Sequence, residues 1–371
     1  SLKVNRTAKK QFLFSAVCAI LRCNSPLERM RDFMKAIGRA ILSAIFLVLT
    51  GLMAVAAKYA PQFVFSFYPA FSRKVLAFLS SVSSLLPIAL WEVLAGLAIL
   101  WFFYTFICIF TKHRGFLTWL TGVILAASVA LFLFTGLWGL NHFAPGIGQT
   151  LGLDVREYSK EELIAATNYY AAQATQYAGT VQRDEAGRAQ LADFQTLSKQ
   201  AGDGYLSLRS AYPQIDGATD PVKSLLSWRL FSQFGTTGIF ICFTGESCVN
   251  PDTYEAWIPF TMCHEIGHRQ AVAAEDEANF CAYLACMENP KNDFRYSGAF
   301  AAYIYCNNAL AKVDRSAASE IWQNVAEGVR TDAQAANAHY AQYEGKVQDA
   351  AQKVNDAYLK AFNEESGVQS Y

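Results

Sequence analysis

The chain has 371 residues, enough for two units of ordinary size, and 53% of them are hydrophobic. Its 31 basic and 31 acidic residues give a formal net charge of zero, so the composition does not favour a nucleic-acid partner. This average conceals two different parts. Residues 1–145 are mostly apolar and aromatic with few acids, whereas residues 150–371 are mixed, alanine-rich and charged.

Three apolar stretches of the first part are long enough to cross a bilayer, which takes about 20 residues. They cover about residues 41–57, 85–110 and 116–140, and such long uncharged runs are costly to bury in a soluble fold. Glu92 is the one acid inside a predicted span, close enough to one end to reach the interface or a neighbouring helix. The shorter apolar segment "QFLFSAVCAILRC" at residues 11–23 has the length of a signal-peptide core. A cleaved signal peptide is disfavoured, because basic residues and a span follow this segment.

Basic residues predict the orientation of these spans. Nine of them lie within residues 1–40, and the link at 111–115 between the second and third spans is short and basic. The positive-inside rule then places the N-terminus and this link in the cytoplasm. We therefore predict a cytoplasmic segment over 1–40, a three-helix anchor over 41–145 and an extracytoplasmic domain over 146–371. The aromatic, serine-rich loop at about 60–84 is expected at the outer membrane surface.

The second part is predicted to be mainly helical with a small β element. Ser159 and Glu162 form a capping box that should start a helix over about 160–177. The β-branched and aromatic run at 239–243 lies between Gly/Thr-rich segments and predicts a strand. Further helices are expected at about 188–212, 220–232, 275–288, 297–313, 316–329 and 333–362.

One stretch, "TMCHEIGHRQAVAAEDEANF" at residues 261–280, carries the chemistry. Residues i and i+4 of a helix share a face, so His264 and His268 can bind one metal ion. Glu265 lies one step round the helix, where it can take a proton from a water molecule. Thr261 is expected to cap this helix. The pattern favours a catalytic zinc site, which needs a third protein ligand and an open position for water.

An acidic cluster, Glu275 to Glu277, offers the third ligand. On one continuous helix Glu275 would lie about 10 Å further along the axis than His268, at 1.5 Å per residue, which is too far for a shared ion. The chain must therefore turn within residues 269–274, and a second helix starting near Glu275 must pack back against the first. This geometry leaves the choice among the acids open.

"EDEAN" resembles the E-x-x-A-D/N pattern of several HExxH metallopeptidases, among them the HtpX and CAAX-prenyl-protease group and the ImmA-type peptidases. The resemblance implies that Glu275 is the zinc ligand and that Asn279, one helical turn later, supports a histidine ligand. Only six residues separate His268 from Glu275, which departs from the HtpX pattern. Glu277 therefore stays a second choice.

A wider resemblance covers nearly the whole chain. The stretches "FTGESCVN", "PFTMCHEIGH", "EDEANFCAYLAC", "FRYSG" and "NDAYLK…SGVQSY", with the three-span N-terminal half, resemble an uncharacterised bacterial membrane family, domain of unknown function 3810. The resemblance implies a zinc metallopeptidase with one Zn²⁺ ion, anchored in the bacterial cell membrane, but it supplies no substrate. The expected fold class is mainly α, with three N-terminal transmembrane helices and a helical zincin-like domain with a small β element.

A hydrolase also needs a donor for the oxyanion of its transition state. Tyr296 is the first candidate, and Arg295, Tyr303 and Tyr305 are weaker ones. The predicted strand can pair with an extended peptide. The candidate substrate-binding residues are Gly238, Ile239, Phe240, Glu246, Asn250 and Arg295.

Two histidines outside the motif, His142 and His339, are expected to be bystanders. The cysteines after residue 240 are interpreted as small buried hydrophobes, with a Cys242–Cys248 disulfide as the alternative. The favoured function is a zinc metallopeptidase with Glu265 as general base, acting on a peptide or protein at the bilayer. The alternatives are a metal-binding sensor or scaffold with little turnover, and a zinc amidohydrolase for a cell-wall or lipid-linked substrate.

Overall fold

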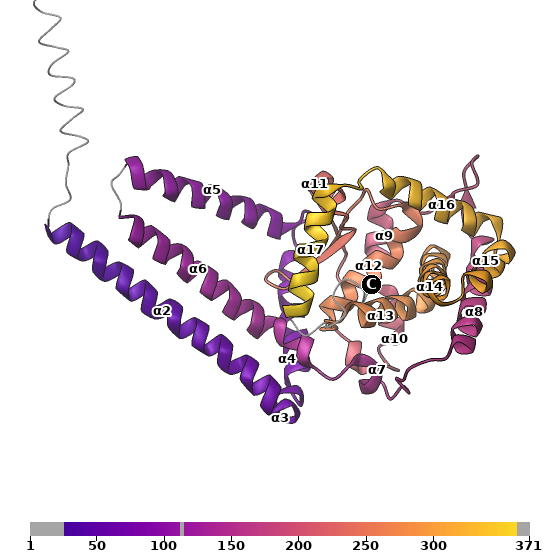
Figure 1. The fold of residues 1–371 in the computed structure, drawn as a ribbon, viewed down its shortest axis with the longest axis horizontal. Helices are drawn as coiled ribbons and strands as arrows, with labels where there is room; N and C mark the ends of the chain where they lie inside the picture. The colour runs from indigo at the N-terminus through magenta and orange to yellow at the C-terminus, as the bar shows by residue number, and fades with distance from the viewer. Residues whose placement is uncertain (1–25, 112–114, 362–371) are drawn as a thin grey trace, which may run out of the picture. The chain divides into compact units, whose positions relative to one another are not determined.

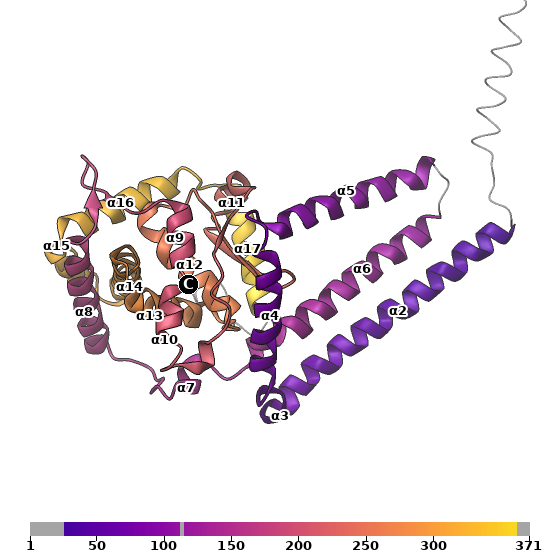
Figure 2. The ribbon, with the colours of Figure 1, turned by 180° about the vertical axis from the view of Figure 1, so that it is seen from behind.

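The computed structural model describes residues 26–111 and 115–361. It is 73% helical with few short strands, so the predicted mainly α fold class is confirmed. The chain divides into two compact units, one formed by residues 1–49 and 97–132 and the other by residues 50–96 and 133–371. Figures 1 and 2 show the chain from opposite sides.

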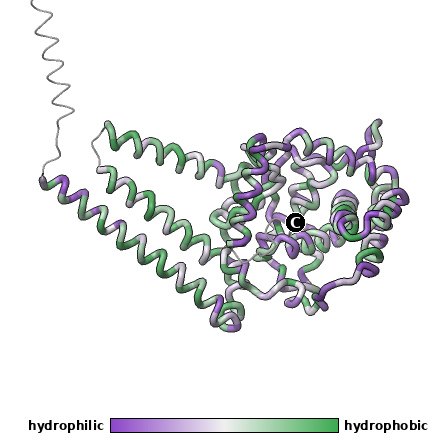
Figure 3. Tube along the Cα trace, viewed as in Figure 1, coloured by the Kyte–Doolittle hydropathy of each residue, from purple (hydrophilic) through white to green (hydrophobic). Residues whose placement is uncertain are grey.

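Three helices are long and apolar enough to cross a membrane: α2 (Pro26–Tyr59, 34 residues), α5 (Leu90–Thr111, 22 residues) and α6 (Phe116–Leu137, 22 residues). Figure 3 shows these helices as the most continuously hydrophobic part of the chain. The protein is therefore a membrane protein. The second helix starts five residues later than the apolar run predicted, because residues 84–89 around Pro87 form turns and bends. Residues 1–25 of the predicted cytoplasmic segment lie outside the described residues.

The first unit consists of parts of these three helices. The Arg39 guanidinium donates a hydrogen bond to the Thr118 carbonyl at 2.5 Å, and the Thr118 hydroxyl donates to the Asp32 carbonyl at 3.1 Å. Phe46 and Phe132 pack with their ring centroids 5.3 Å apart. These contacts tie α2 to α6 within the unit, with aromatic packing at one end and polar contacts near the start of α6.

The segment between the first and second spans, predicted as a loop near 60–84, belongs to the second unit and is largely helical. It forms two helices, α3 (Pro61–Phe65) and α4 (Tyr68–Ser83). Pro61 and Pro69 lie in the first turns of these helices, where a missing N–H costs nothing, so they start the helices and do not interrupt them. The buried residues of α4 recur every fourth position: Tyr68, Ser72, Leu76 and Ser80.

The remaining elements follow in chain order. They are η1 (Gly139–Phe143), α7 (Ile147–Thr150), α8 (Lys160–Ala178), β1 (Gln182–Arg183), β2 (Ala189–Gln190), α9 (Phe194–Gln200), α10 (Asp203–Leu208), η2 (Pro213–Ile215), β3 (Lys223–Ser224), α11 (Trp228–Phe234), β4 (Gly238–Ile241), β5 (Glu246–Val249), η3 (Glu255–Trp257), α12 (Ile258–Arg269), α13 (Glu275–Glu288), α14 (Asn292–Val313), α15 (Arg315–Asn324), α16 (Glu327–Ala341) and α17 (Lys346–Ala361).

Local signals predicted some of these elements well and others badly. The capping box that starts α8 is present, since the Ser159 hydroxyl accepts from the Glu162 amide at 3.1 Å and Glu162 accepts from the Ser159 amide at 2.8 Å. The helix predicted at 188–212 is wrong, because β2, α9 and α10 occupy that stretch. Gly204 lies inside α10 and lets this helix pack closely on α13, because a Cβ there would lie 1.9 Å from the Ala285 carbonyl oxygen.

A small sheet has the strand order β3–β5–β4, in which β3 and β5 are parallel and β4 and β5 are antiparallel. The predicted strand is β4, and its hairpin partner β5 was not predicted. Gly238 of β4 lies opposite Val249, and Ile241 opposite Glu246. In the described part of the chain β4 is paired on one side only, which makes it an edge strand.

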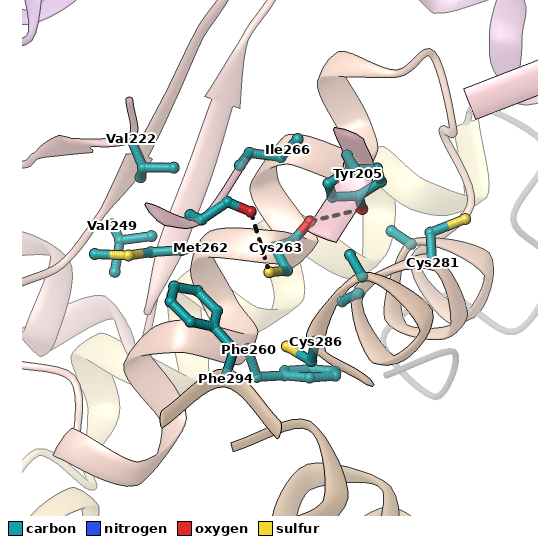
Figure 4. Close-up of a cluster of buried hydrophobic side chains, with 14 of the residues drawn as sticks. Tyr205, Val222, Val249, Phe260, Met262, Cys263, Ile266, Cys281, Cys286 and Phe294 are labelled. Atoms are coloured by element: carbon teal, nitrogen blue, oxygen red, sulfur yellow. Dashed lines mark hydrogen bonds between the residues drawn. The ribbon is translucent and has the colours of Figure 1, made fainter. Parts of the chain in front are cut away.

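A hydrophobic core lies beneath α12, between α10, α13, α14 and the sheet. Figure 4 shows this core, in which the Tyr205 hydroxyl donates to the Cys263 carbonyl at 2.9 Å. Its cysteines are fully buried, and all seven cysteines in the described residues are free. The prediction that cysteines act as buried hydrophobes is confirmed for the described ones after residue 240 except Cys306, which is half-buried, and Cys242 and Cys248 form no disulfide.

Candidate metal centre

The HEIGH motif lies on α12, every residue of which is buried. The helix begins at Ile258 with Pro259 in its first turn, three residues before the expected cap at Thr261. The Thr261 hydroxyl instead donates to the Trp257 carbonyl at 2.9 Å. One face of α12 enters the apolar core, so the motif histidines project from a helix that tertiary packing holds in place.

The turn that the distance argument required is present. Helix α12 ends at Arg269, Ala271 adopts a left-handed φ of 69°, and α13 begins at Glu275. Gly267 faces both neighbours of α12, because a Cβ there would lie 3.1 Å from the Tyr205 hydroxyl oxygen of α10 and in ordinary contact, 3.5 Å, with the Ala278 carbonyl oxygen of α13. The first turn of α13 therefore returns to the histidines of α12.

Three side chains converge at this point. One ligand atom each from His264, His268 and Glu275 lies within 4.8 Å of the others, and all three residues are buried. The Nε2 atoms of the two histidines are 3.1 Å apart, and Glu275 Oε2 lies 3.1 Å from His264 Nε2 and 3.5 Å from His268 Nε2. The structure thus brings together the predicted first-choice set of three ligands.

Hydrogen bonds on the far side of each imidazole fix its orientation. His268 Nδ1 is 2.8 Å from the Val272 carbonyl oxygen, which can only accept, so this nitrogen carries a proton. His264 Nδ1 is 2.9 Å from Asn279 Oδ1 in the same way. In the neutral imidazoles both Nε2 lone pairs then point at one another and at the Glu275 carboxylate. Three acceptors that face one point fit a cation, and two imidazoles with one carboxylate form a donor set typical of catalytic zinc.

The other acids of the cluster lie elsewhere. Glu277 Oε1 accepts a hydrogen bond from the Ile147 amide at 2.6 Å and lies against Gly146, where a Cβ would be 2.6 Å from it. Asp276 Oδ1 accepts from the Glu277 amide at 2.8 Å. Among the described residues, only Glu275 of the three acids shares the metal-binding group with the histidines.

Burial and close charges shift the pKa values of this group. Burial acts to raise the pKa of Glu275, but the two imidazoles outweigh it and hold that pKa well below its usual range. Burial acts to lower the pKa of His268, but Glu275 outweighs it and raises the pKa to about 9. Without a cation, therefore, a proton occupies the space between the ligands.

Glu265 is buried beside the ligands. Burial raises its pKa to about 7, although the His264 and His268 imidazoles oppose the shift. Its Oε2 atom has no hydrogen-bond partner among the described residues. A Cβ at Gly238 would lie 2.3 Å from Glu265 Oε1, so the edge strand β4 passes directly over this carboxyl group. A carboxyl group whose pKa lies near neutrality is suited to take up and release a proton.

A family described as "Protein of unknown function (DUF3810)" matches residues 65–371. The chain belongs to this family. The match includes α4, α5, α6 and the entire metal-binding group. No curated protein and no solved structure matches the chain. The family description states no activity, so the chemistry of this DUF3810 protein has to be argued from its own residues.

The predicted substrate-binding residues of the DUF3810 chain divide into two groups. Gly238, Ile239 and Phe240 lie on the edge strand β4, next to Glu265, as the prediction requires. Glu246 instead is buried, and its carboxylate accepts from the Leu90 and Trp91 amides at 2.8 Å each. It is not at a cleft rim, because it caps the start of α5.

Asn250 is also buried away from a cleft rim. Its side-chain amide donates to the Ser232 hydroxyl at 2.9 Å and to the Thr236 carbonyl at 3.2 Å. These bonds fix the segment that leads from α11 into β4. Asn250 thus helps to position the edge strand β4 through the segment before it, and its side chain has no free polar group for a peptide.

The predicted oxyanion donor Tyr296 is not brought together with the ligands. It is fully buried in a second core, its hydroxyl donates to the Asp332 carboxylate, and the Arg183 guanidinium lies 5.5 Å from its ring centroid. A hydroxyl held by a buried carboxylate is not available to a substrate. Arg295 is half-buried, and its Nε has no hydrogen-bond partner among the described residues.

Trp138, His142 and Tyr358, which the sequence did not single out for the site, lie beside it or interact with it, as does Tyr305, a weaker candidate from the sequence. The Trp138 indole donates to the His268 carbonyl at 3.2 Å, and the His142 ring lies 4.9 Å from the Trp138 ring. Burial, with a smaller contribution from His268, lowers the pKa of His142 to about 4. The Tyr358 hydroxyl is 3.4 Å from His142 Nε2. Burial, with a smaller contribution from Glu275, raises the pKa values of Tyr305 and Tyr358.

His142 therefore lies beside the metal-binding group and is not a bystander by position. His339 is elsewhere, with its Nε2 2.6 Å from the Asp252 carbonyl oxygen. Local sequence offered one weak signal for His142, the run "GLWGLNHF" at residues 136–143, which overlaps the end of the third apolar stretch. Nothing in its spacing relates that run to a motif more than 120 residues later.

Proposed function

We propose that this DUF3810 protein is a membrane-anchored zinc metallopeptidase that hydrolyses peptide bonds. The observation that carries the proposal is the convergence of three acceptor atoms, from His264, His268 and Glu275, next to the buried carboxyl group of Glu265. A cluster of three metal ligands with no nearby acid or base would favour a structural site. A glutamate with a pKa near 7 at this place favours catalysis.

The chain supplies the groups that such a reaction needs. Zinc held by the three ligands would polarise the scissile carbonyl and make a water molecule more acidic. Glu265 takes the proton from that water and passes it to the leaving amine. Asn279 and the Val272 carbonyl hold the two imidazoles in the tautomer that presents Nε2 to the ion.

The edge strand provides a place for an extended substrate. A peptide that pairs with the open side of β4 runs past Gly238, whose missing side chain lets the Glu265 carboxyl group lie directly against this strand. His142, Tyr305 and Tyr358 take over the expected role of Tyr296 in this proposal, because they interact with the ligands and carry groups that can donate to an oxyanion.

We also propose that the protein lies in a bacterial cell membrane with its N-terminus in the cytoplasm and the metal-binding unit outside. The support is the excess of basic residues before the first span and in the link between α5 and α6. Labelling of single cysteines introduced at exposed positions of α8 and at residue 113 with a membrane-impermeant reagent tests this. Labelling of residue 113 in intact cells would contradict it.

Zinc content and proteolysis of the full-length chain in nanodiscs test the function. We expect one zinc per chain in the wild type and in Glu265→Gln, with cleavage of a mixed peptide library at least about 100-fold slower in the variant. Glu277→Gln is the matched control, because Glu277 is an acid of the same cluster that faces Ile147. It should cleave as the wild type does.

Two outcomes would replace this proposal by an alternative. Stoichiometric zinc without cleavage of any peptide by the wild type would favour a metal-binding sensor or scaffold. Release of amide products from cell-wall or lipid-linked material, with no peptide cleaved, would favour an amidohydrolase.

A further inference from the structure

We propose that the metal centre acts on peptide bonds close to the bilayer surface, so that its substrates are juxtamembrane segments of membrane-anchored proteins. This inference rests on the proposed function and names its substrate class. Three elements support it: the end of the span α6, the start of the span α5 and the surface helix α4. Each of them contacts residues that border the ligands.

The first element is the end of α6. A helix of 22 residues extends about 33 Å, close to the roughly 30 Å of a hydrocarbon core, so its last turn lies at one membrane boundary. Trp138 follows that turn, packs against Phe134 with ring centroids 5.9 Å apart, and donates to the His268 carbonyl at 3.2 Å. One buried side chain therefore connects the end of a span to a metal-ligand residue.

The second element is the start of α5. Glu246 of β5 accepts hydrogen bonds from the first two amides of α5, where the helix dipole is positive. In the opposite direction, Glu92 of α5 accepts from the Leu226 amide at 2.7 Å and from the Ser227 amide at 2.9 Å. Because β5 pairs with β4, and β4 passes over Glu265, the sheet that lines the site is fixed to the beginning of a span.

The third element is α4. Its inner face contacts the site: the Ser80 hydroxyl accepts from the Arg269 guanidinium at 3.0 Å, one residue after a ligand. A Cβ at Gly245, in the turn between β4 and β5, would lie 2.6 Å from the Leu76 carbonyl oxygen. The outer face exposes Phe71 at 49% and Phe78 at 66% of their surface. Such a helix, with a span before it and another after it, suits the plane of a bilayer surface.

The ligand-bearing helix α12, the sheet beside it and the surface helix α4 are thus each attached at the end of a span or lie between two spans. Peptide bonds that a substrate holds close to the bilayer surface are therefore the ones that this site can meet. A substrate anchored in the same bilayer also gains effective concentration from its tether. A peptide that diffuses freely in water gains neither advantage.

The dependence of cleavage on tether length tests this inference. A peptide that the wild type cleaves is attached to a lipid headgroup through Gly/Ser linkers of 5, 10 and 20 residues and incorporated into nanodiscs with the full-length, zinc-loaded chain. The shortest linker should give the fastest cleavage, with a fall of about eightfold at 20 residues, since effective concentration decreases as roughly the −3/2 power of tether length. The same peptide free at equal overall concentration should be cleaved at least about tenfold more slowly.

Cleavage that rises with linker length, or that is as fast for the free peptide, would overturn the inference while the proposed function stands. If the peptide library yields no peptide that the wild type cleaves, the proposed function is overturned instead. A second measurement, which needs no enzymatic activity, then tests how close the site lies to the bilayer surface. Cu²⁺ replaces zinc in the site, since it binds N/O donor sets more tightly, and the relaxation of nitroxide lipids is measured by electron paramagnetic resonance.

Headgroup nitroxides should relax faster with bound Cu²⁺ than nitroxides at the bilayer centre or on a water-soluble probe. The control is the double variant His264→Ala/His268→Ala, which should lose both the bound Cu²⁺ and the effect. The inference would be overturned if the wild type binds stoichiometric Cu²⁺ and the headgroup nitroxides do not relax faster.

Discussion

Two buried glutamates of the second unit, Glu246 and Glu275, face opposite kinds of neighbours. Around Glu246 every close partner is a donor: the Leu90 and Trp91 amides and the Lys223 ammonium at 2.6 Å. Around Glu275 the close partners are ring nitrogens whose other nitrogens already face acceptors. The first carboxylate is satisfied by the protein itself, whereas the second needs a cation or a proton. Burial of a carboxylate therefore does not by itself indicate a metal site. The neighbouring hydrogen-bond donors and acceptors must be counted as well.

The largest expected effect is on zinc affinity, and it should distinguish Glu275 from Glu277 in the acidic cluster. Glu275→Ala removes one of three ligands, so we expect zinc affinity to fall by more than about 100-fold, beyond the 10- to 100-fold typical of supporting residues. Glu277→Ala should retain wild-type affinity. Competition with a chromophoric chelator measures both. The reverse pattern would transfer the third ligand to Glu277.

Loss of the ion pair at Glu246 should lower the stability of the protein and leave its zinc affinity unchanged. Lys223→Met leaves the buried Glu246 without its charged partner, and loss of one partner of a buried ion pair costs about 3 to 5 kcal/mol. We expect that decrease in the free energy of unfolding in detergent. Folded Lys223→Met protein should still bind zinc with wild-type affinity. A loss of affinity in the folded variant would show that the two regions are coupled.

The pH dependence of the metal-free chain should also separate the two regions. The pKa of His268 is raised from 6.5 to about 9 by Glu275. Its stabilising contribution is therefore complete below pH 6.5 and disappears as pH rises through 9. Chemical unfolding at pH 6 and pH 9.5 should show lower stability at the higher pH for the metal-free wild type. Zinc-loaded protein, in which the ion replaces the proton, should lack this decrease.

The same proton competes with zinc. Zinc affinity should rise by roughly tenfold per pH unit between pH 7 and pH 9, as one proton is displaced for each ion bound. A pH-independent affinity in this interval would contradict the arrangement of the three acceptors.

The parts of this site that could be predicted from the sequence are those set by local geometry. Spacing placed His264 and His268 on one face, and the helical rise required a turn before Glu275. Both are properties of a few consecutive residues, and both match the structure. The choice of Glu275 came from the resemblance of "EDEAN" to other peptidases, and the geometry agrees with it.

The errors concern residues whose partners are distant in sequence. Glu246 was expected at a cleft rim, but its amide partners are 155 and 156 residues away. Tyr296 was expected at the site, but its hydroxyl binds Asp332, 36 residues later. His142 was expected to be a bystander, yet it lies beside Trp138 and Tyr358. The polarity of these side chains is visible in the sequence, whereas their partners depend on the packing of the whole unit.

The smallest predicted effect separates a supporting residue from a ligand. Asn279 accepts from His264 Nδ1 and fixes its tautomer without touching the ion. Asn279→Ala should weaken zinc binding by about 10- to 100-fold, because both imidazole nitrogens then compete for the proton. Asn279→Asp keeps an acceptor at the same place, so it should retain most of the affinity. If both variants bind zinc equally weakly, Asn279 acts through packing against α12, and the hydrogen bond to His264 does not set the affinity of the centre.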